Sequence, residues 1–291
     1  MRHKILLDTD IGTDIDDALC LAYLLLKPDC ELLGITTVTG EPEKRAGMAA
    51  HLCQIAGQEV PIYSGIDTPL LVGQQQKLAQ QAKVLGNQIE TNRSKPVETL
   101  TFLQETIRDN PGEITLLTIG PLTNIGLLFA MDREIPSMLK SLVIMGGHFG
   151  LENDSLPKVE WNIVGDPHAS AIVYNAIVPQ HRSIGLDVTS QVTMQADEFR
   201  RSFQHELFEP IHKFAEIWFE YSETITFHDP LAAVSIFNDG VCNFRSGKVD
   251  IDLSPGEVQG RTFWNEGKGP HEVAMAVDAV RFFQEYNSVI K

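Results

Sequence analysis

The stretch LLDTDIGTDIDDAL, residues 6–19, joins an apolar strand to an apolar helix through a run of acidic residues. Five carboxylates lie in this run: Asp8, Asp10, Asp14, Asp16 and Asp17. Capping of the helix uses one or two of them. Five would repel one another unless a cation joins them, and carboxylate oxygens without cysteine or histidine suit a hard cation such as Ca²⁺ or Mg²⁺. Because open α/β sheets bind ligands at the carboxyl ends of their strands, the stretch predicts a metal site there.

Outward from this stretch, short apolar strands alternate with helical stretches. The expected strands are residues 4–7, 32–38, 114–119, 141–145 and 183–186, with a further strand pair near 248–264. The expected helices are residues 17–27, 42–56, 96–110, 122–131, 167–176, 197–223, 229–237 and 272–288. The strands are apolar without alternation, which is typical of strands buried on both faces. The pattern predicts an α/β fold with a mostly parallel central sheet flanked by helices, and a single domain over residues 1–291.

Composition and charge disfavour nucleic acids and membranes as partners. The chain has 39 acidic and 23 basic side chains, a formal charge of −16, which disfavours nucleic acid and anionic membrane surfaces as partners. The amino-terminal residues MRHKILLD contain no signal-peptide core, and no apolar run approaches the ~18 residues of a membrane helix. The four cysteines show no paired spacing, so we expect free thiols, mostly buried, and a cytoplasmic protein.

Two familiar motifs compete for the acidic stretch. An EF-hand loop opening at Asp8 would need glycine where Thr13 stands and glutamate where Leu19 stands. An Asp-x-Asp pair at a strand end also opens phosphatases of the haloacid dehalogenase type, in which Asp8 would be the nucleophile and Mg²⁺ the cofactor. That chemistry needs a later lysine and a second acidic pair at another strand end, and neither is evident in the sequence.

Three later segments allow more than one interpretation. In TFHDPLAAV (226–234), Asp229 can be a simple helix cap before Pro230. In VEWNIV (159–164), Glu160 and Asn162 share one face if the backbone is extended, which suits a polyol ligand but also an exposed edge strand. The glutamine-rich residues 73–95 are either a solvated helix or loop, or a lid over a site.

The segment DTDIGTDIDDA (8–18) resembles the amino-terminal signature of the nucleoside hydrolases, the inosine–uridine-preferring family, whose common form is Asp-x-Asp-x-Gly-x-Asp-Asp-Ala. The present loop is two residues longer, so Asp16 and Asp17 match the final pair and Asp14 is extra. The resemblance continues through four further segments: TTVTGEPEKRA (36–46), TIGPLTNIGLL (118–128), MGGHFG (145–150) with VEWNIVGDPHAS (159–170), and TFHDPLAAV (226–234).

The resemblance implies Ca²⁺-dependent hydrolysis of the N-glycosidic bond of a riboside to free base and ribose. It assigns the metal to four residues: Asp10, Asp17, Asp229 and the main-chain carbonyl of Ile119. It assigns removal of a proton from the attacking water to Asp16, with Asp14 as the other candidate, and protonation of the departing base to His228. It also implies a homodimer or homotetramer.

The same resemblance assigns the riboside to five side chains: Asp16, Glu41, Asn153, Glu160 and Asn162. Two departures from the family pattern support an alternative, a non-catalytic relative that binds a sugar or riboside through the metal. Glu41 stands where many members have asparagine, and residues 73–95 contain no histidine, whereas the family commonly has a His-Gly pair in this part of the chain.

Overall fold

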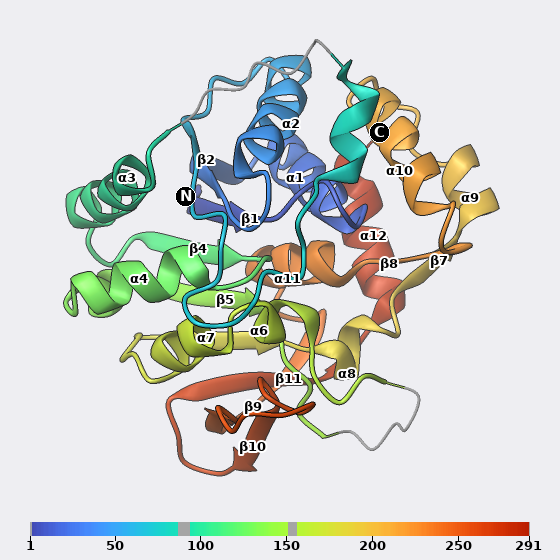
Figure 1. The fold of residues 1–291 in the computed structure, drawn as a ribbon. Coiled ribbons are helices and arrows are strands. Elements are labelled where there is room, and N and C mark those ends of the chain that lie inside the picture. The colour runs from blue at the N-terminus through green and yellow to red at the C-terminus, as the bar shows by residue number, and fades with distance from the viewer. Residues whose placement is uncertain (1, 87–93, 151–155, 291) are drawn as a thin grey trace.

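The computed structural model describes residues 2–86, 94–150 and 156–290 (Figure 1). Within these residues, nine strands form one sheet in the order β10-β9-β11-β6-β5-β4-β1-β2-β3. Their bounds are β1 His3–Thr9, β2 Cys30–Thr37, β3 Ile62–Ser64, β4 Ile114–Thr118, β5 Ser141–Met145, β6 His181–Ile184, β9 Cys242–Ile251, β10 Thr262–Glu266 and β11 His271–Val277. Neighbours from β3 to β11 are parallel, and only the pairs of β9 with β11 and β10 are antiparallel. The predicted mostly parallel α/β sheet is confirmed.

Helices cover both faces of this sheet (Figure 1). Side chains of β1 alternate between the two faces: Ile5 and Leu7 pack into one hydrophobic core and Leu6 into the other. The first core is closed by α1 (Asp16–Leu26), α2 (Pro42–Ile55), α10 (Phe208–Trp218), α11 (His228–Phe237) and α12 (Ala279–Val289). The second is closed by α3 (Pro96–Asp109), α4 (Thr123–Met131) and α7 (Pro167–Tyr174).

Shorter elements complete the described chain. They are α5 (Ile135–Met138), α6 (Trp161–Gly165), α8 (Leu186–Thr189), α9 (Ala196–Arg201), a 3₁₀ turn η1 (Gln80–Val84) and a two-stranded antiparallel pair of β7 (Thr193–Gln195) with β8 (Thr224–Thr226). No helix in the described part of the chain combines the length and apolar character needed to cross a bilayer.

Two of the expected helices were wrong in part. The segment 272–288 begins as strand β11, because His271–Val277 pairs with β6 on one side and β9 on the other, and only its second half is helix α12. The expected helix 197–223 is split into α9 and α10, and Thr224 then starts β8. The antiparallel pair near 248–264 is present as β9 and β10.

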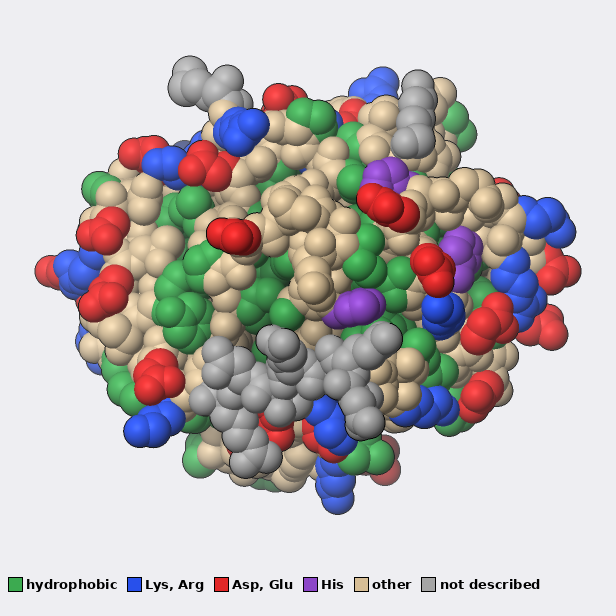
Figure 2. All heavy atoms as spheres, turned by 90° about the horizontal axis from the view of Figure 1, so that it is seen from above, with side chains coloured by type: hydrophobic (Ala, Val, Ile, Leu, Met, Phe, Trp, Pro, Cys, Tyr) green, Lys and Arg blue, Asp and Glu red, His purple; other side chains and the backbone are tan. Residues whose placement is uncertain are grey.

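The surface carries charges of both signs. Among the described residues on the face in Figure 2, Lys and Arg side chains lie singly or next to acidic ones. This face therefore presents no continuous basic area for a phosphate backbone, in agreement with the formal charge of −16.

Candidate active site

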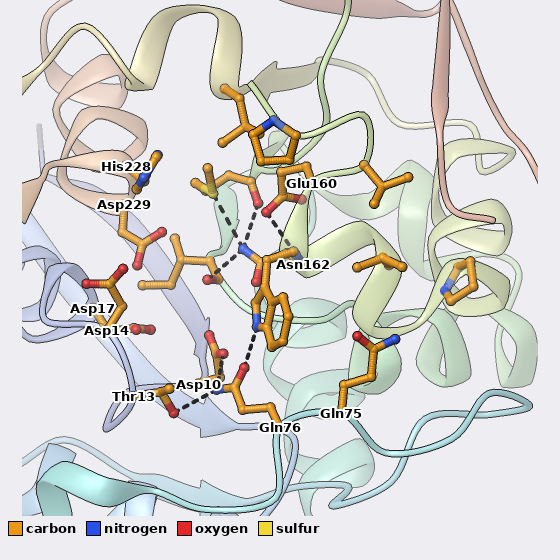
Figure 3. A pocket seen from close by; sticks show the side chains of 18 of the residues that line it. Asp10, Thr13, Asp14, Asp17, Gln75, Gln76, Glu160, Asn162, His228 and Asp229 are labelled. Atoms are coloured by element: carbon orange, nitrogen blue, oxygen red, sulfur yellow. Dashed lines mark hydrogen bonds between the residues drawn. The ribbon is translucent and has the colours of Figure 1, made fainter. Parts of the chain in front are cut away.

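A cavity of about 880 Å³ opens at the carboxyl ends of the parallel strands (Figure 3). Asp10 follows β1, Ile119 follows β4 and Met145 ends β5, and all three line it. Seven carboxylates are among the lining residues: Asp10, Asp14, Asp16, Asp17, Glu160, Asp229 and Glu257. The aromatic rings of Trp161 and Trp218 also face this space. The cavity thus combines an acidic floor with surfaces onto which a flat ring can pack.

Three buried carboxylates form the centre of the acidic floor. Asp16 and Asp17 open α1, and Asp229 lies in the first turn of α11, which packs against α1. One oxygen from each lies within 4.8 Å of the other two. The main-chain N–H of Asp229 also donates to Asp16 Oδ2 (3.1 Å), and the Thr9 hydroxyl donates to Asp17 Oδ1 (2.6 Å). The alternative interpretation of Asp229 as a simple helix cap does not hold, because Phe227 is the N-cap residue of α11 and no side chain caps this helix.

The electrostatics of this cluster favour a bound cation. Burial raises the pKa of Asp16, Asp17 and Asp229 well above the ordinary value, and repulsion from the neighbouring carboxylates raises each pKa further. A divalent ion would offset both effects, because it offers the ionised carboxylates the partner that water no longer provides. The donor atoms are all hard oxygens, so the residues present fit a calcium-type ion.

Asp10 lies beside this cluster, and one of its two carboxylate oxygens accepts a hydrogen bond from a neighbouring side chain. Its Oδ2 atom accepts a hydrogen bond from Gln76 Nε2 (2.7 Å). Its other oxygen lies close to Gly120, where an added Cβ would come within 2.8 Å of Asp10 Oδ1. The glycine after Ile119 therefore keeps the approach to Asp10 open, and the Ile119 carbonyl lies at the same edge of the sheet.

The extended alternative for this segment holds at Glu160 but not at Asn162, because helix α6 starts at Trp161. Glu160 is its N-cap and accepts from the main-chain N–H groups of Asn162 (2.8 Å) and Ile163 (3.0 Å), and also from Gly147 (3.1 Å). Burial raises the pKa of Glu160 to about 7. Both side chains nevertheless line the cavity, since the helix start directs them there.

Asn162 is tied to the backbone of two strand ends. Its Nδ2 atom donates to the carbonyls of Ile119 (3.0 Å) and Met145 (3.1 Å). The residue is 5% exposed. It therefore fixes the Ile119 carbonyl, which the sequence analysis assigned to the metal, as well as facing the cavity.

His228 lies on the same side of the cavity as Asp229 (Figure 3). Its Nδ1 atom is 2.7 Å from the Thr189 hydroxyl. The second ring nitrogen, Nε2, takes no part in this contact. Burial lowers the pKa of His228 to about 4. The imidazole is therefore neutral at neutral pH in this arrangement.

One candidate residue, Glu41, does not line the cavity. Glu41 precedes α2 with a positive φ of 59°, and its carboxylate pairs with Lys44 and accepts from the Ala79 N–H (3.0 Å). It is not among the residues that line the cavity. Asn153 lies outside the described residues. Asp14, the extra carboxylate of the longer loop, does line the cavity, and burial raises its pKa to about 7.

Asp8 lies below the site rather than in it. Its side chain is 0% exposed, and its Oδ1 atom accepts from Thr36 Oγ1 and Asn124 Nδ2. A substrate in the cavity therefore has no access to this carboxylate. The geometry disfavours the phosphatase reading, in which Asp8 would be the nucleophile.

Sequence reasoning missed two buried polar residues that hold the acidic loop. Arg45 of α2 is 0% exposed, and its guanidinium donates to the carbonyls of Gly40 (2.9 Å), Ile11 (3.1 Å) and Asp10. Gln76 contacts the same loop from residues 73–79. Neither residue has a local sequence signal, because charged helices and glutamine-rich segments are usually solvated.

Comparison with known proteins identifies relatives along nearly the whole chain. Residues 5–284 match the family model described as inosine-uridine preferring nucleoside hydrolase. A probable uridine nucleosidase 2 of Arabidopsis thaliana is 30% identical, over 96% of this chain and 94% of that protein. A pyrimidine-specific ribonucleoside hydrolase of Escherichia coli (strain SE11) is 30% identical, over 91% of this chain and 88% of that protein.

Solved structures share the fold. A plant nucleoside hydrolase, PpNRh1, superposes with a TM-score of 0.86 at 24% identity, covering 100% of this chain and 99% of that one. A purine-preferring ribonucleoside hydrolase from Gardnerella vaginalis superposes with a TM-score of 0.82 at 23% identity, covering 99% and 98%.

Proposed function

Because the chain belongs to the inosine-uridine preferring nucleoside hydrolase family, and so to the N-glycosyl hydrolases, we propose that it hydrolyses ribonucleosides to free base and ribose with Ca²⁺ as cofactor. The observation that carries the proposal is the trio of buried carboxylates within 4.8 Å of one another at the floor of a cavity of about 880 Å³. A riboside combines a diol that suits such a floor with a flat base that suits the aromatic walls.

Four groups would hold the ion: the carboxylates of Asp10, Asp17 and Asp229 and the carbonyl of Ile119. Bound there, Ca²⁺ would coordinate the ribose diol and orient and acidify a water molecule. Asp16 lies in the same cluster with Oδ2 bound to the Asp229 N–H, so its remaining oxygen is the one that takes the proton from the attacking water. Burial and the neighbouring carboxylates raise its pKa, which makes the ionised carboxylate a stronger proton acceptor.

The chain's own carboxylates also favour the charge that develops on the sugar. Cleavage of an N-glycosidic bond passes through an oxocarbenium-like transition state, and nearby anionic groups stabilise its positive charge. Glu160 and Asn162 lie across the cavity from Asp17 and Asp229 and face the ribose from the other side (Figure 3). We also assign the ribose to Asn153, as the family resemblance implies. Glu41, which the resemblance also suggests, pairs with Lys44 outside the cavity lining and is left out of this assignment.

His228 is assigned to protonation of the departing base. With a pKa of about 4 the protonated imidazole is a strong acid but is scarce at neutral pH, so in each turnover the ring takes up a proton from solvent water and then passes it to the departing base. The Thr189 hydroxyl at Nδ1 fixes the ring and directs this exchange to Nε2.

We propose that the enzyme is cytoplasmic and forms a homodimer or homotetramer. Four free cysteines, three of them buried, support the reducing compartment, and the subunit number follows from the family resemblance. Light scattering after gel filtration measures the subunit number directly.

The decisive experiment is a reducing-sugar assay over a panel of purine and pyrimidine ribonucleosides with Ca²⁺. We expect ribose release from at least one of them, its loss after chelation, and its recovery on addition of Ca²⁺. The variant Asp17→Asn is the matched control, since it keeps the shape of the side chain and removes the charge. Ribose binding by calorimetry without any hydrolysis would instead identify a non-catalytic relative.

A further inference from the structure

Gln76 is a buried residue within an exposed segment. It is 6% exposed, whereas its neighbours Gln75 and Lys77 are exposed, and residues 73–79 have no regular secondary structure. A long polar side chain is buried only where its hydrogen-bonding groups find partners. The partners of Gln76 therefore indicate what this residue does.

The amide of Gln76 makes three hydrogen bonds, and the two to Asp10 and Thr13 start from its nitrogen (Figure 3). Nε2 donates to Asp10 Oδ2 (2.7 Å) and to Thr13 Oγ1 (2.9 Å). Oε1 accepts from the indole N–H of Trp161 (2.5 Å). Asp10 follows strand β1 and Trp161 begins helix α6, so the amide links two elements that lie far apart in the sequence.

Chemistry allows only one orientation of this amide. The indole N–H of Trp161 is a donor only, and an ionised Asp10 carboxylate is an acceptor only. The nitrogen must therefore face Asp10 and the oxygen must face Trp161. A glutamate at this position could accept from the indole but, when ionised, could not donate to Asp10.

The backbone around Gln76 is held as firmly as its side chain. Its carbonyl accepts from the Gly40 N–H (3.2 Å), and a side chain on Gly40 would collide with that carbonyl. Further along, Gln81 N–H donates to the Gly12 carbonyl (3.0 Å). The segment is thus hydrogen-bonded at Gln76 to the turn before α2 and, further along, to the acidic loop.

We propose that Gln76 is a positioning residue that fixes the Asp10 carboxylate and couples its orientation to Trp161 in the cavity wall. Gln76 donates a hydrogen bond to Oδ2 of Asp10. The other oxygen, Oδ1, is then the one that faces the ion and the substrate. The role in turnover rests on the proposed function, but the effect on Asp10 does not, because it is measurable through the metal alone.

The test compares Gln76→Ala, Gln76→Glu and Trp161→Phe, with Gln80→Ala as the control from the exposed part of the same segment. Loss of a hydrogen bond to a charged group corresponds to a roughly 10- to 100-fold effect. We expect Gln76→Ala to lower kcat on the best riboside by that factor while KM changes by less than about threefold. Ca²⁺ titrated calorimetrically without substrate should bind several-fold more weakly. Gln80→Ala should match the wild type in both measurements.

The relative kcat values of Gln76→Glu and Gln76→Ala distinguish a positioning role of Gln76 from a role in packing alone. Glutamate has almost the shape of glutamine, so a packing role predicts that Gln76→Glu stays near the wild type and that only Gln76→Ala loses activity. Positioning through the N–H donor predicts that Gln76→Glu turns over no faster than Gln76→Ala. A kcat for Gln76→Glu within about threefold of the wild type would overturn the proposal.

Coupling to Trp161 is tested by a double-mutant cycle. We expect Trp161→Phe to lower kcat less than Gln76→Ala does, and to lower it no further in the Gln76→Ala background. Fully additive losses in kcat would show that the two side chains act independently. If no riboside is hydrolysed at all, the proposed function fails, and the inference is then decided by calorimetry: an unchanged Ca²⁺ affinity in Gln76→Ala would refute it.

Discussion

Replacing Asp8 by asparagine should stabilise the metal-free protein at neutral pH and have little effect in acid. Burial raises the pKa of Asp8 from 3.8 to about 7, against the lowering effect of its hydrogen bonds from Thr36 and Asn124. Between these two pH values the folded protein keeps a proton that the unfolded chain has already released. The stability of the wild type therefore falls as the pH rises through this window, whereas an asparagine has nothing to titrate.

The size of the effect follows from the difference between the two pKa values. At 1.36 kcal/mol per pH unit, the rise from 3.8 to about 7 corresponds to an upper limit of ~4 kcal/mol. About 3 kcal/mol of this develops between about pH 4.5 and about pH 7. At roughly 2–4 °C per kcal/mol, the Tm of Asp8→Asn relative to the wild type should rise by roughly 6–12 °C across that interval.

The assay is thermal denaturation of both proteins in a metal chelator at the two pH values. The exposed Asp67→Asn is the control, and its Tm difference from the wild type should not depend on pH. An equal Tm difference for Asp8→Asn at both pH values would refute the reasoning, because it would show that the carboxyl does not titrate between them. The same variant should retain riboside hydrolysis, whereas complete loss with intact folding would support a nucleophilic role for Asp8.

Three further predictions concern the cavity itself. Asp17→Asn should abolish the stabilisation of the fold by Ca²⁺, which reaches ~2.7 kcal/mol at a hundredfold excess of Ca²⁺ over Kd and is measured as a rise in Tm. An undiminished rise in Tm would remove Asp17 from the metal site. His228→Ala should slow the hydrolysis of inosine or uridine by ~10²–10⁴-fold but spare a p-nitrophenyl riboside, and parallel losses on both would exclude leaving-group protonation. Asn162→Ala should lower both kcat/KM and stability, the latter by ~1–3 kcal/mol, because two buried carbonyls lose their donor. An unchanged Tm and kcat/KM would contradict the role of that side chain.

The sequence predicted the central sheet because its strands are continuous apolar runs between helices. The prediction was wrong where neighbouring strands determine the secondary structure of a segment. His271–Val277 contains alanine and methionine, which are common in helices. It nevertheless forms a strand, because it pairs with β6 on one side and β9 on the other. Glu160 was expected in an extended segment, yet its carboxylate caps a five-residue helix that is too short to show a helical period.

The acidic cluster could be predicted because aspartate is rarely repeated so densely without a cation. The buried residues that hold the acidic loop in place, Arg45 and Gln76, could not be predicted. Gln76 looks like every other glutamine in residues 73–95 until the fold places it between Asp10 and Trp161. The charge of Glu41 was expected to disturb the site, but the positive φ at this residue and the neighbouring Lys44 direct its carboxylate away from the cavity lining.

The burial of Arg45 has a consequence for the ancestry of this loop. Its guanidinium binds the carbonyls of Asp10 and Ile11 and the hydroxyl of Thr13 (3.1 Å), which lie directly before Asp14, the extra residue of the longer loop. This arginine therefore supplies several donors and a positive charge at the start of a loop that carries several negative charges. The two features should therefore be inherited as a unit. Homologues with the shorter loop should lack the arginine, and those with the longer loop should retain it even where their substrates differ.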